Sequence, residues 1–303
     1  MVYDILIVGG GPAGLTAAIY GLRAGKTVLV VEKAGFGGQI AFSPKVENIP
    51  GTQLISGAEF AEKLTEQVMA LGADVELETV IKVEKDGDVF KVLTEEGSAF
   101  EGRSVILALG VKHRTLGLPG EEELIGNGIS FCAVCDGAFY AGQDVAMIGG
   151  GNSALQEALL LSEVCNKVTI VQNLAFLTGE KKLADTLATK DNVEIIYSTV
   201  VNNYLTKDGA ISGIEVRNEE TGALRTISVD GVFLAVGLQP ENEPFAGFAQ
   251  LNDWGYFDCG EDCCTKTPGV FVAGDCRSKR IRQVVTASAD GAIAAMAACR
   301  YLD

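Results

Sequence analysis

One pattern of hydrophobic positions occurs twice in the chain. A short apolar strand runs into a glycine turn, a helical stretch follows, and a second apolar strand ends the unit. The first copy takes residues 2–8, the turn 9–14, a helix to about Ala24 and residues 27–31; the second takes residues 145–148, the turn 149–154, a helix to about Val164 and residues 167–171. Apolar strands linked through a helix are typical of buried parallel sheets. The pattern therefore predicts an α/β protein with two Rossmann-like dinucleotide-binding domains.

The first glycine turn, residues 9–14, has the spacing of a dinucleotide-binding signature. Gly9 permits the tight turn, Gly11 lets backbone approach a pyrophosphate, and Gly14 lets helix and strand pack closely, while the helix start offers amide donors. Glu32, 23 residues after Gly9, is placed to bind the ribose hydroxyls of an adenosine. The turn residues predicted to contact the cofactor are Gly9, Gly11, Pro12, Ala13 and Gly14.

The second glycine turn keeps the phosphate-binding spacing but lacks the acidic residue. Gly149, Gly151 and Ala154 hold the three small-residue positions, and the residue after the following strand is Gln172. The phosphate end of a nucleotide site is therefore expected here, whereas the ribose end has lost its usual carboxylate. The residues predicted to line this second site are Gly149, Gly151, Asn152, Ser153 and Ala154.

Charge and hydropathy exclude two classes of partner. The chain of 303 residues has a formal net charge of −16, and a surface of that sign repels a nucleic-acid backbone. Residues 5–22 are uncharged and long enough to suggest a membrane span. The glycine turn and Pro12 interrupt them, and no basic signal-peptide region precedes them. We expect a cytoplasmic protein that binds neither nucleic acid nor membrane, with its eight cysteines kept mainly as thiols.

A pair of cysteines two residues apart is the strongest chemical signal. Cys132 and Cys135 are spaced to close a disulfide, and Asp136 follows with a carboxyl that can handle a proton. A zinc site would need further ligands, but the chain has one histidine, His113. The spacing of Cys259, Cys263, Cys264 and Cys276 matches no zinc or iron–sulfur pattern, so no metal site is predicted. One histidine also argues against a Ser-His-Asp or Cys-His hydrolase.

An ordered set of motifs along nearly the whole chain resembles the low-molecular-weight thioredoxin reductases. The motifs are Gly9 to Gly14, Gly37-Gly38-Gln39, Val46-Glu47-Asn48, residues 106–110, Cys132-Ala-Val-Cys135-Asp136-Gly137, Gly149 to Ala154, Gly274-Asp275 and Arg282-Gln283. The resemblance implies an FAD domain built from residues 1–112 and 242–303, with an NAD(P)H-type domain of residues 116–240 inserted into it. It also implies a three-layer ββα form of the fold and a homodimer.

The same resemblance assigns roles to individual residues. Those implied to bind FAD, besides the first turn and Glu32, are Lys33, Gly38, Gln39, Asn48, Gly110, Asp275, Arg282, Gln283 and Val284. Cys135 is implied to react with reduced flavin, and Cys132 to attack the disulfide of a thioredoxin-like protein. Asp136 is implied to be the general acid and base. The segments around residues 111–119 and 237–244 are implied to be hinges for rotation of the inserted domain.

The sequence departs from this family where NADPH is recognised. Members carry His-Arg-Arg after the strand and one more arginine four residues later, whereas this chain has Gln172-Asn173-Leu174 and Thr178. Losing two charged hydrogen bonds weakens binding by about 3–6 kcal/mol, on the order of a hundredfold to ten-thousandfold. Ordinary NADPH affinity is therefore not expected, although Lys181 or Lys182 offers a substitute cation.

Three functions follow from this departure. The first is a thioredoxin reductase driven by NADPH or NADH through unusual recognition. The second is a thioredoxin reductase driven by another donor, reduced ferredoxin or a deazaflavin, as in some anaerobic relatives. For ferredoxin, the four cations between Arg277 and Arg282 would form a docking patch on an acidic protein. The third is a flavin-binding redox sensor without turnover, which the dithiol and Asp136 make the weakest of the three.

Overall fold

The computed structural model describes residues 1–43 and 46–303. The chain divides into two compact units, one formed by Met1–Pro44, Ile49–Lys112 and Gln239–Asp303 and the other by Lys45–Asn48 and His113–Leu238. Short strands in the two connecting segments, β7 (Lys112–His113) and β16 (Leu238–Gln239), pair with each other.

A seven-stranded sheet forms the centre of the first unit. Its strand order is β3-β2-β1-β6-β5-β4, and β17 pairs with the end of β6. The strands are β1 (Val2–Val8), β2 (Val28–Glu32), β3 (Asp74–Leu77), β4 (Val80–Asp86), β5 (Val89–Thr94), β6 (Ala99–Leu107) and β17 (Val270–Val272). Strands β1, β2, β3, β6 and β17 run parallel, and β4 and β5 are antiparallel.

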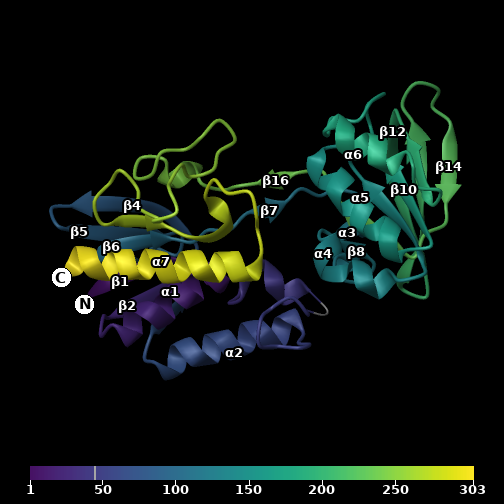
Figure 1. Ribbon diagram of the computed structural model, residues 1–303. Helices are drawn as coiled ribbons and strands as arrows, with labels where there is room; N and C mark the ends of the chain where they lie inside the picture. Colours follow the sequence, from purple (N-terminus) through teal and green to yellow (C-terminus); the bar gives the residue numbers. More distant parts are fainter. Residues whose placement is uncertain (44–45) are drawn as a thin grey trace. The chain divides into compact units, whose positions relative to one another are not determined.

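Helices cover one face of this sheet. Figure 1 shows α1 (Pro12–Arg23) and α7 (Val284–Leu302) side by side along it, with α2 (Gly57–Ala70) beyond. Alanines of α1 and α7 form one buried cluster with Ile5, Ile7 and Val30, and a second cluster on the opposite face includes Phe90, Phe245 and Phe257. Short 3-10 helices lie at Gly38–Phe42, Glu243–Phe245 and Gly274–Cys276.

The close packing of α1 and α7 depends on glycine. A Cβ added at Gly291 of α7 would lie 2.1 Å from the Ala13 carbonyl oxygen, and one at Gly14 of α1 would lie 1.9 Å from the Gly9 oxygen. Both separations are far inside van der Waals contact, so no other residue fits at either position without backbone movement. The two helices and the end of β1 are thereby held together around the first glycine turn.

The second unit repeats the arrangement with a five-stranded parallel sheet of order β11-β10-β9-β15-β8. The strands are β8 (Ile129–Ser130), β9 (Asp144–Ile148), β10 (Lys167–Val171), β11 (Val193–Ile196) and β15 (Gly231–Leu234). An antiparallel sheet of β12 (Thr199–Lys207), β13 (Ala210–Asn218) and β14 (Leu224–Ile227) belongs to the same unit. Its helices are α3 (Glu121–Leu124), α4 (Ala133–Asp136), α5 (Asn152–Val164) and α6 (Lys181–Leu187), with a 3-10 helix at Gly137–Tyr140.

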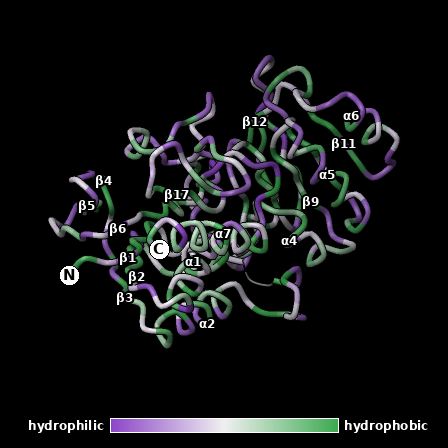
Figure 2. The backbone as a smooth tube through the Cα atoms, turned by 60° about the vertical axis from the view of Figure 1, so that its left-hand side comes forward, coloured by the Kyte–Doolittle hydropathy of each residue, from purple (hydrophilic) through white to green (hydrophobic). Residues whose placement is uncertain are grey.

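The predicted α/β class with two Rossmann-like domains is confirmed. β1 and β10 have the predicted bounds, and β2 is shifted by one residue, since it begins at Val28 instead of Thr27 and ends at Glu32 instead of Val31. Strands β2 and β15 are buried along their whole length, and β1, β6, β9 and β10 are buried over their last four residues. Figure 2 colours much of these strands as hydrophobic. None of the helices within the described ranges has the length and hydrophobicity that a bilayer span requires.

Candidate functional site

The first glycine turn lies at the carboxyl ends of β1, β6 and β17. Gly9 has a φ of 110°, and a Cβ there would lie 2.3 Å from the Ala108 oxygen at the end of β6. A Cβ at Gly274, just after β17, would lie 2.8 Å from that of Ala13. In open α/β sheets, ligands bind outside these strand ends. The fold thus brings residues 9–14 together with Gly110 and Asp275.

The start of α1 is free to bind an anion. Gly11 is the N-cap, Pro12 stands in the first turn, and no side chain of the described residues caps the helix. A Cβ on Gly11 would meet described atoms only at 4.0 Å, from Gly37 and Gly38. The amides of Ala13 and Gly14 are therefore available to a phosphate, whereas that of Leu15 donates to the Gly11 oxygen at 2.9 Å.

Glu32 is nine-tenths buried and binds the turn directly. Its Oε2 accepts a hydrogen bond from the Gly10 amide at 2.6 Å, and its Oε1 accepts one from the Ala34 amide at 3.0 Å. A carboxylate with both oxygens engaged by backbone amides is fixed in place. Glu32 thus holds the turn and stands at the position expected for a ribose acceptor.

Asp275 has an unsatisfied oxygen. Its Oδ1 is buried and has no hydrogen-bond partner among the described residues, and burial raises the pKa of the carboxyl to about 6. A buried polar atom without a partner costs about 1–3 kcal/mol, so a native protein seldom retains one without a purpose. A ligand hydroxyl at this strand end would supply the missing donor.

The other residues predicted to bind the cofactor occupy varied places. The Gln39 amide donates to the Val111 oxygen at 2.5 Å, Gly38 lies against Gly11, and Lys33 pairs with Glu241. Asn48 is exposed. Gly110 has a φ of 65° and an open surface, Gln283 caps α7, and Val284 is the first residue of that helix.

The cationic segment after β17 is not a docking patch, and that prediction is wrong. Arg277 is 2% exposed and its Nη1 lies 3.0 Å from Asp290, while Lys279 lies 2.8 Å from the other oxygen of Asp290. Two of the four cations are therefore neutralised inside the unit. Arg282 stacks over the Tyr256 ring at 4.4 Å and donates to the Asp275 backbone oxygen, so only Arg280 of the four is classed as exposed.

The two predicted redox cysteines form a disulfide at the start of α4, with Cα atoms 5.3 Å apart. The Cys135 amide donates to the Cys132 Sγ at 3.2 Å. Ser130 joins the pair to the predicted acid, because its Oγ accepts from the Cys132 amide at 3.1 Å and donates to Asp136 Oδ2 at 2.5 Å. Val134, between the cysteines, is 59% exposed. The remaining cysteines are free thiols, and no group of three metal-ligating side chains occurs in residues 1–43 and 46–303.

The second glycine turn has the backbone of the first. Gly149 has a φ of 129° and a Cβ there would lie 2.5 Å from the Ala235 oxygen, while Gly151 is the N-cap of α5. Asn152 is exposed and accepts a hydrogen bond from the Glu180 amide at 2.6 Å. Ser153 is exposed and Ala154 buried. The turn thus offers free amides, as the first one does.

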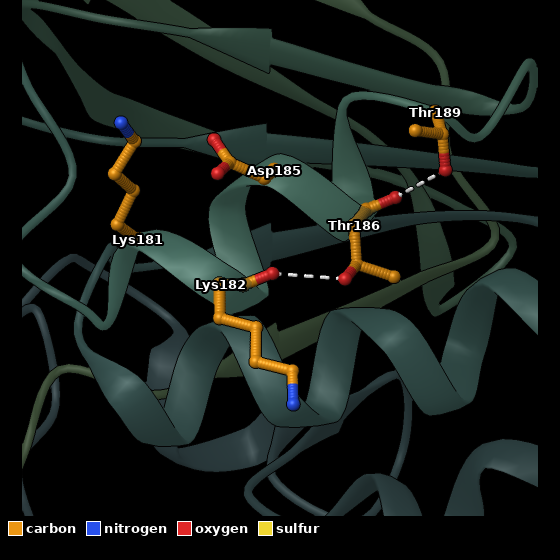
Figure 3. Close-up of a pocket in the computed structure, with 5 residues that line it drawn as sticks. All are labelled: Lys181, Lys182, Asp185, Thr186 and Thr189. Atoms are coloured by element: carbon orange, nitrogen blue, oxygen red, sulfur yellow. Dashed lines mark hydrogen bonds between the residues drawn. The ribbon is translucent and has the colours of Figure 1, made fainter.

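The ribose end of the second turn is occupied by protein. Gln172 is 3% exposed and its side-chain amide donates to the Phe176 oxygen at 2.9 Å. It therefore does not present an acceptor to ribose hydroxyls as a carboxylate would. Leu174 is 39% and Phe176 61% exposed. Lys181 and Lys182 line a surface pocket with Asp185, Thr186 and Thr189, and Figure 3 shows the two lysine side chains extending away from each other. They do not converge on one phosphate.

Comparison with known proteins identifies the family. Residues 3–291 match the model described as pyridine nucleotide-disulphide oxidoreductase. The chain is 40% identical to a "34.2 kDa protein in rubredoxin operon" of Clostridium pasteurianum over 99% of its length and 97% of that protein, and 36% identical to a thioredoxin reductase of Bacillus subtilis over 100% and 95%. The structure of a thioredoxin reductase from Streptococcus pyogenes matches with a TM-score of 0.93 and 38% identity, over 99% and 98% of the two chains.

The chain belongs to the pyridine nucleotide-disulphide oxidoreductases, and within them to the low-molecular-weight thioredoxin reductase family. The resemblance seen in the sequence is thereby confirmed. So is the prediction of an enzyme, a flavin-dependent disulfide reductase of the thioredoxin reductase type. Sequence reasoning did not find Ser130 or Glu157, which contact the cysteine turn through single hydrogen bonds and carry no motif.

The raised pKa of Asp275 predicts a pH-dependent stability. Burial raises it from its ordinary value of 3.8 to about 6, so ionisation destabilises the folded, cofactor-free protein as pH rises between these values. The substitution Asp275→Asn should therefore stabilise the cofactor-free protein at pH 7.5, by at most about 3 kcal/mol, and have little effect at pH 4. Urea unfolding at both pH values measures this. The exposed Asp253→Asn is the control, and equal effects of Asp275→Asn at both pH values would contradict the assignment.

Proposed function

We propose that this protein is an FAD-dependent thioredoxin-disulfide reductase that passes electrons through Cys132 and Cys135 to a thioredoxin-like protein. The observation that carries the proposal is the disulfide at the start of α4, linked through Ser130 to the carboxyl of Asp136. The Bacillus subtilis and Streptococcus pyogenes relatives, both called thioredoxin reductases, support it. A flavin-binding sensor without turnover has no use for a carboxyl joined to the disulfide in this way.

The first unit has the groups that FAD needs. The uncapped start of α1 fits a pyrophosphate, Glu32 fits the adenosine ribose, and the orphaned Asp275 oxygen fits a hydroxyl of the ribityl chain. When bound, FAD supplies two-electron transfer to the disulfide. Residues 1–112 and 242–303 are therefore proposed as the FAD domain and residues 116–240 as the inserted domain.

The two cysteines are proposed to have different duties. Cys132 attacks the disulfide of the partner protein, forming a mixed disulfide and releasing a partner thiolate. Cys135 then attacks the Cys132 sulfur, which frees the reduced partner and restores the intramolecular disulfide. Asp136 gives its proton to the departing thiolate, and Ser130 fixes the position of its carboxyl. Rotation about residues 111–119 and 237–244 gives Cys132 access to the partner.

We further propose that NADPH is a poor donor and that a low-potential donor, ferredoxin or a deazaflavin, reduces the enzyme. Support comes from Gln172, which is directed at the Phe176 oxygen, and from the exposed neutral residues Asn173, Leu174 and Thr178. The Clostridium pasteurianum relative is described as a protein in a rubredoxin operon. NADPH or NADH bound through the intact Gly149–Gly151 turn is the alternative. The homodimer and the cytoplasmic location stay predictions.

Trapping of the mixed disulfide tests the separate duties of the two cysteines. Reduced Cys135→Ser enzyme should form a stable mixed disulfide with thioredoxin, because the thiol that resolves it is missing. Cys132→Ser should form little or none. Non-reducing electrophoresis and mass spectrometry detect the adduct, with Cys165→Ser as the control for a buried free thiol. Equal trapping by both variants would contradict the separate duties, and trapping by Cys132→Ser alone would reverse them.

Restoring the arginines tests the account of the donor. The triple variant Asn173→Arg, Leu174→Arg and Thr178→Arg changes only exposed residues and leaves the buried Gln172 in place. It should lower the NADPH concentration for half-maximal flavin reduction by about tenfold or more, and added salt should diminish the gain.

The control adds the same charge elsewhere, at exposed Asn202, Asn203 and Thr206 of β12. Stopped-flow absorbance under anaerobic conditions measures both variants. An equal gain in the control would show that net charge alone is responsible, and no gain in the first variant would mean that this loop is not the phosphate site.

A further inference from the structure

A second carboxyl, that of Glu157, contacts the cysteine turn. Glu157 lies on α5, and its Oε2 accepts a hydrogen bond from the Ala133 amide at 3.2 Å. Ala133 is buried and is the residue between Cys132, the N-cap of α4, and Val134. Glu157 therefore binds the turn on its α5 side, while the Ser130 hydroxyl accepts from the Cys132 amide and donates to Asp136.

The surroundings of Glu157 favour its neutral form. Burial raises the pKa of the carboxyl to about 7, against the lowering effect of the Ala133 amide and with a smaller contribution from the negative charge of Asp136 on α4. From the 3-10 helix that follows α4, Tyr140 also has a raised pKa, and burial raises that of Cys165 at the end of α5 to about 11. Both are neutral near pH 7. The Lys181, Lys182 and Asp185 side chains of neighbouring α6 are exposed.

Reduction of the Cys132–Cys135 disulfide changes the charge of the turn, and Glu157 is placed to respond to that change. Reduction of the disulfide takes two electrons from the donor, breaks the S–S bond and leaves two thiolates. When one of them takes a proton from solvent and the other stays a reactive thiolate, the cysteine turn gains one negative charge. A carboxyl that is hydrogen-bonded to the same turn and half protonated near neutral pH responds to that charge by taking up a proton.

We propose that Glu157 is a positioning residue of the Cys132–Cys135 turn that takes up a proton when the disulfide is reduced and thereby favours the reactive thiolate. The inference rests on the proposed function in one respect, that these cysteines are the redox couple. Its physical basis is reciprocal: a thiolate raises the proton affinity of Glu157, and a proton on Glu157 raises the acidity of the thiol.

Thiol alkylation between pH 5 and 9.5 tests the inference without thioredoxin. The holoenzyme is reduced with dithiothreitol and freed of it, and iodoacetamide labelling of the Cys132 peptide is followed by mass spectrometry. Glu157→Gln keeps an acceptor for the Ala133 amide but holds no proton. It should lower the apparent pKa of the Cys132 thiol by about one unit. Labelling at pH 8, where the wild-type carboxyl is ionised, should then be about threefold faster, because the larger thiolate fraction is partly offset by lower nucleophilicity. At pH 6 the wild-type carboxyl is mostly protonated, so the two rates should be similar.

The matched control is Glu163→Gln, which removes the same charge from the exposed side of α5. Its labelling profile should follow that of the wild type. The wild-type profile should itself show a second inflection near pH 7, which keeps the test valid if Glu157→Gln does not fold.

Three results would overturn the inference: a wild-type profile with one inflection, an unchanged profile in Glu157→Gln, or labelling slowed equally at every pH, which marks a structural role alone. A shifted thiol pKa in an enzyme that fails to reduce thioredoxin would support Glu157 and refute the proposed partner. The two claims thus fail separately.

Discussion

The fold of each unit depends on one glycine that packs closely against the backbone at the end of a neighbouring strand. Gly9 and Gly149 both have positive φ angles, and a Cβ on either would lie within 2.5 Å of a backbone oxygen, that of Ala108 or of Ala235. This contact joins the end of the first strand to the next parallel strand. It also directs the following helix so that its uncapped amides face the strand ends. Both units are thereby shaped to bind a phosphate.

The two units differ in the residue after the second strand. The Glu32 carboxyl accepts a hydrogen bond from the Gly10 amide, whereas the Gln172 side chain donates one to the Phe176 oxygen and packs on Gly150. The backbone of the second turn is kept, but the acidic residue of the first unit is replaced there by a buried amide. The dithiol of the same unit has two carboxyls around it, Asp136 and Glu157. The proposal of a changed electron donor rests on this difference between the two units.

Local pattern was sufficient for some features and not for others. The sequence predicts β1, β10 and both turns because apolar runs and glycine spacing are local signals. It cannot show that Arg277 and Lys279 are buried, because their partner Asp290 lies a helix turn into α7 and a run of charges usually faces solvent. Glu157 was missed for the same reason, since its contact with Ala133 spans 24 residues. The roles of the first turn and Glu32 were inferred from motif spacing and those of the other predicted FAD residues from family resemblance, and all of them stay predictions.

The proposed change of electron donor rests on the ribose end of the second turn, and one measurement addresses it directly. The oxidised wild-type holoenzyme is mixed anaerobically, in turn, with micromolar NADPH, NADH and reduced ferredoxin, and the loss of flavin absorbance is followed by stopped flow. The account predicts slow reduction by both nucleotides, without saturation at micromolar concentration, and fast reduction by ferredoxin. Rapid, saturable reduction by micromolar NADPH would contradict it and would show that NADPH binds without the missing arginines.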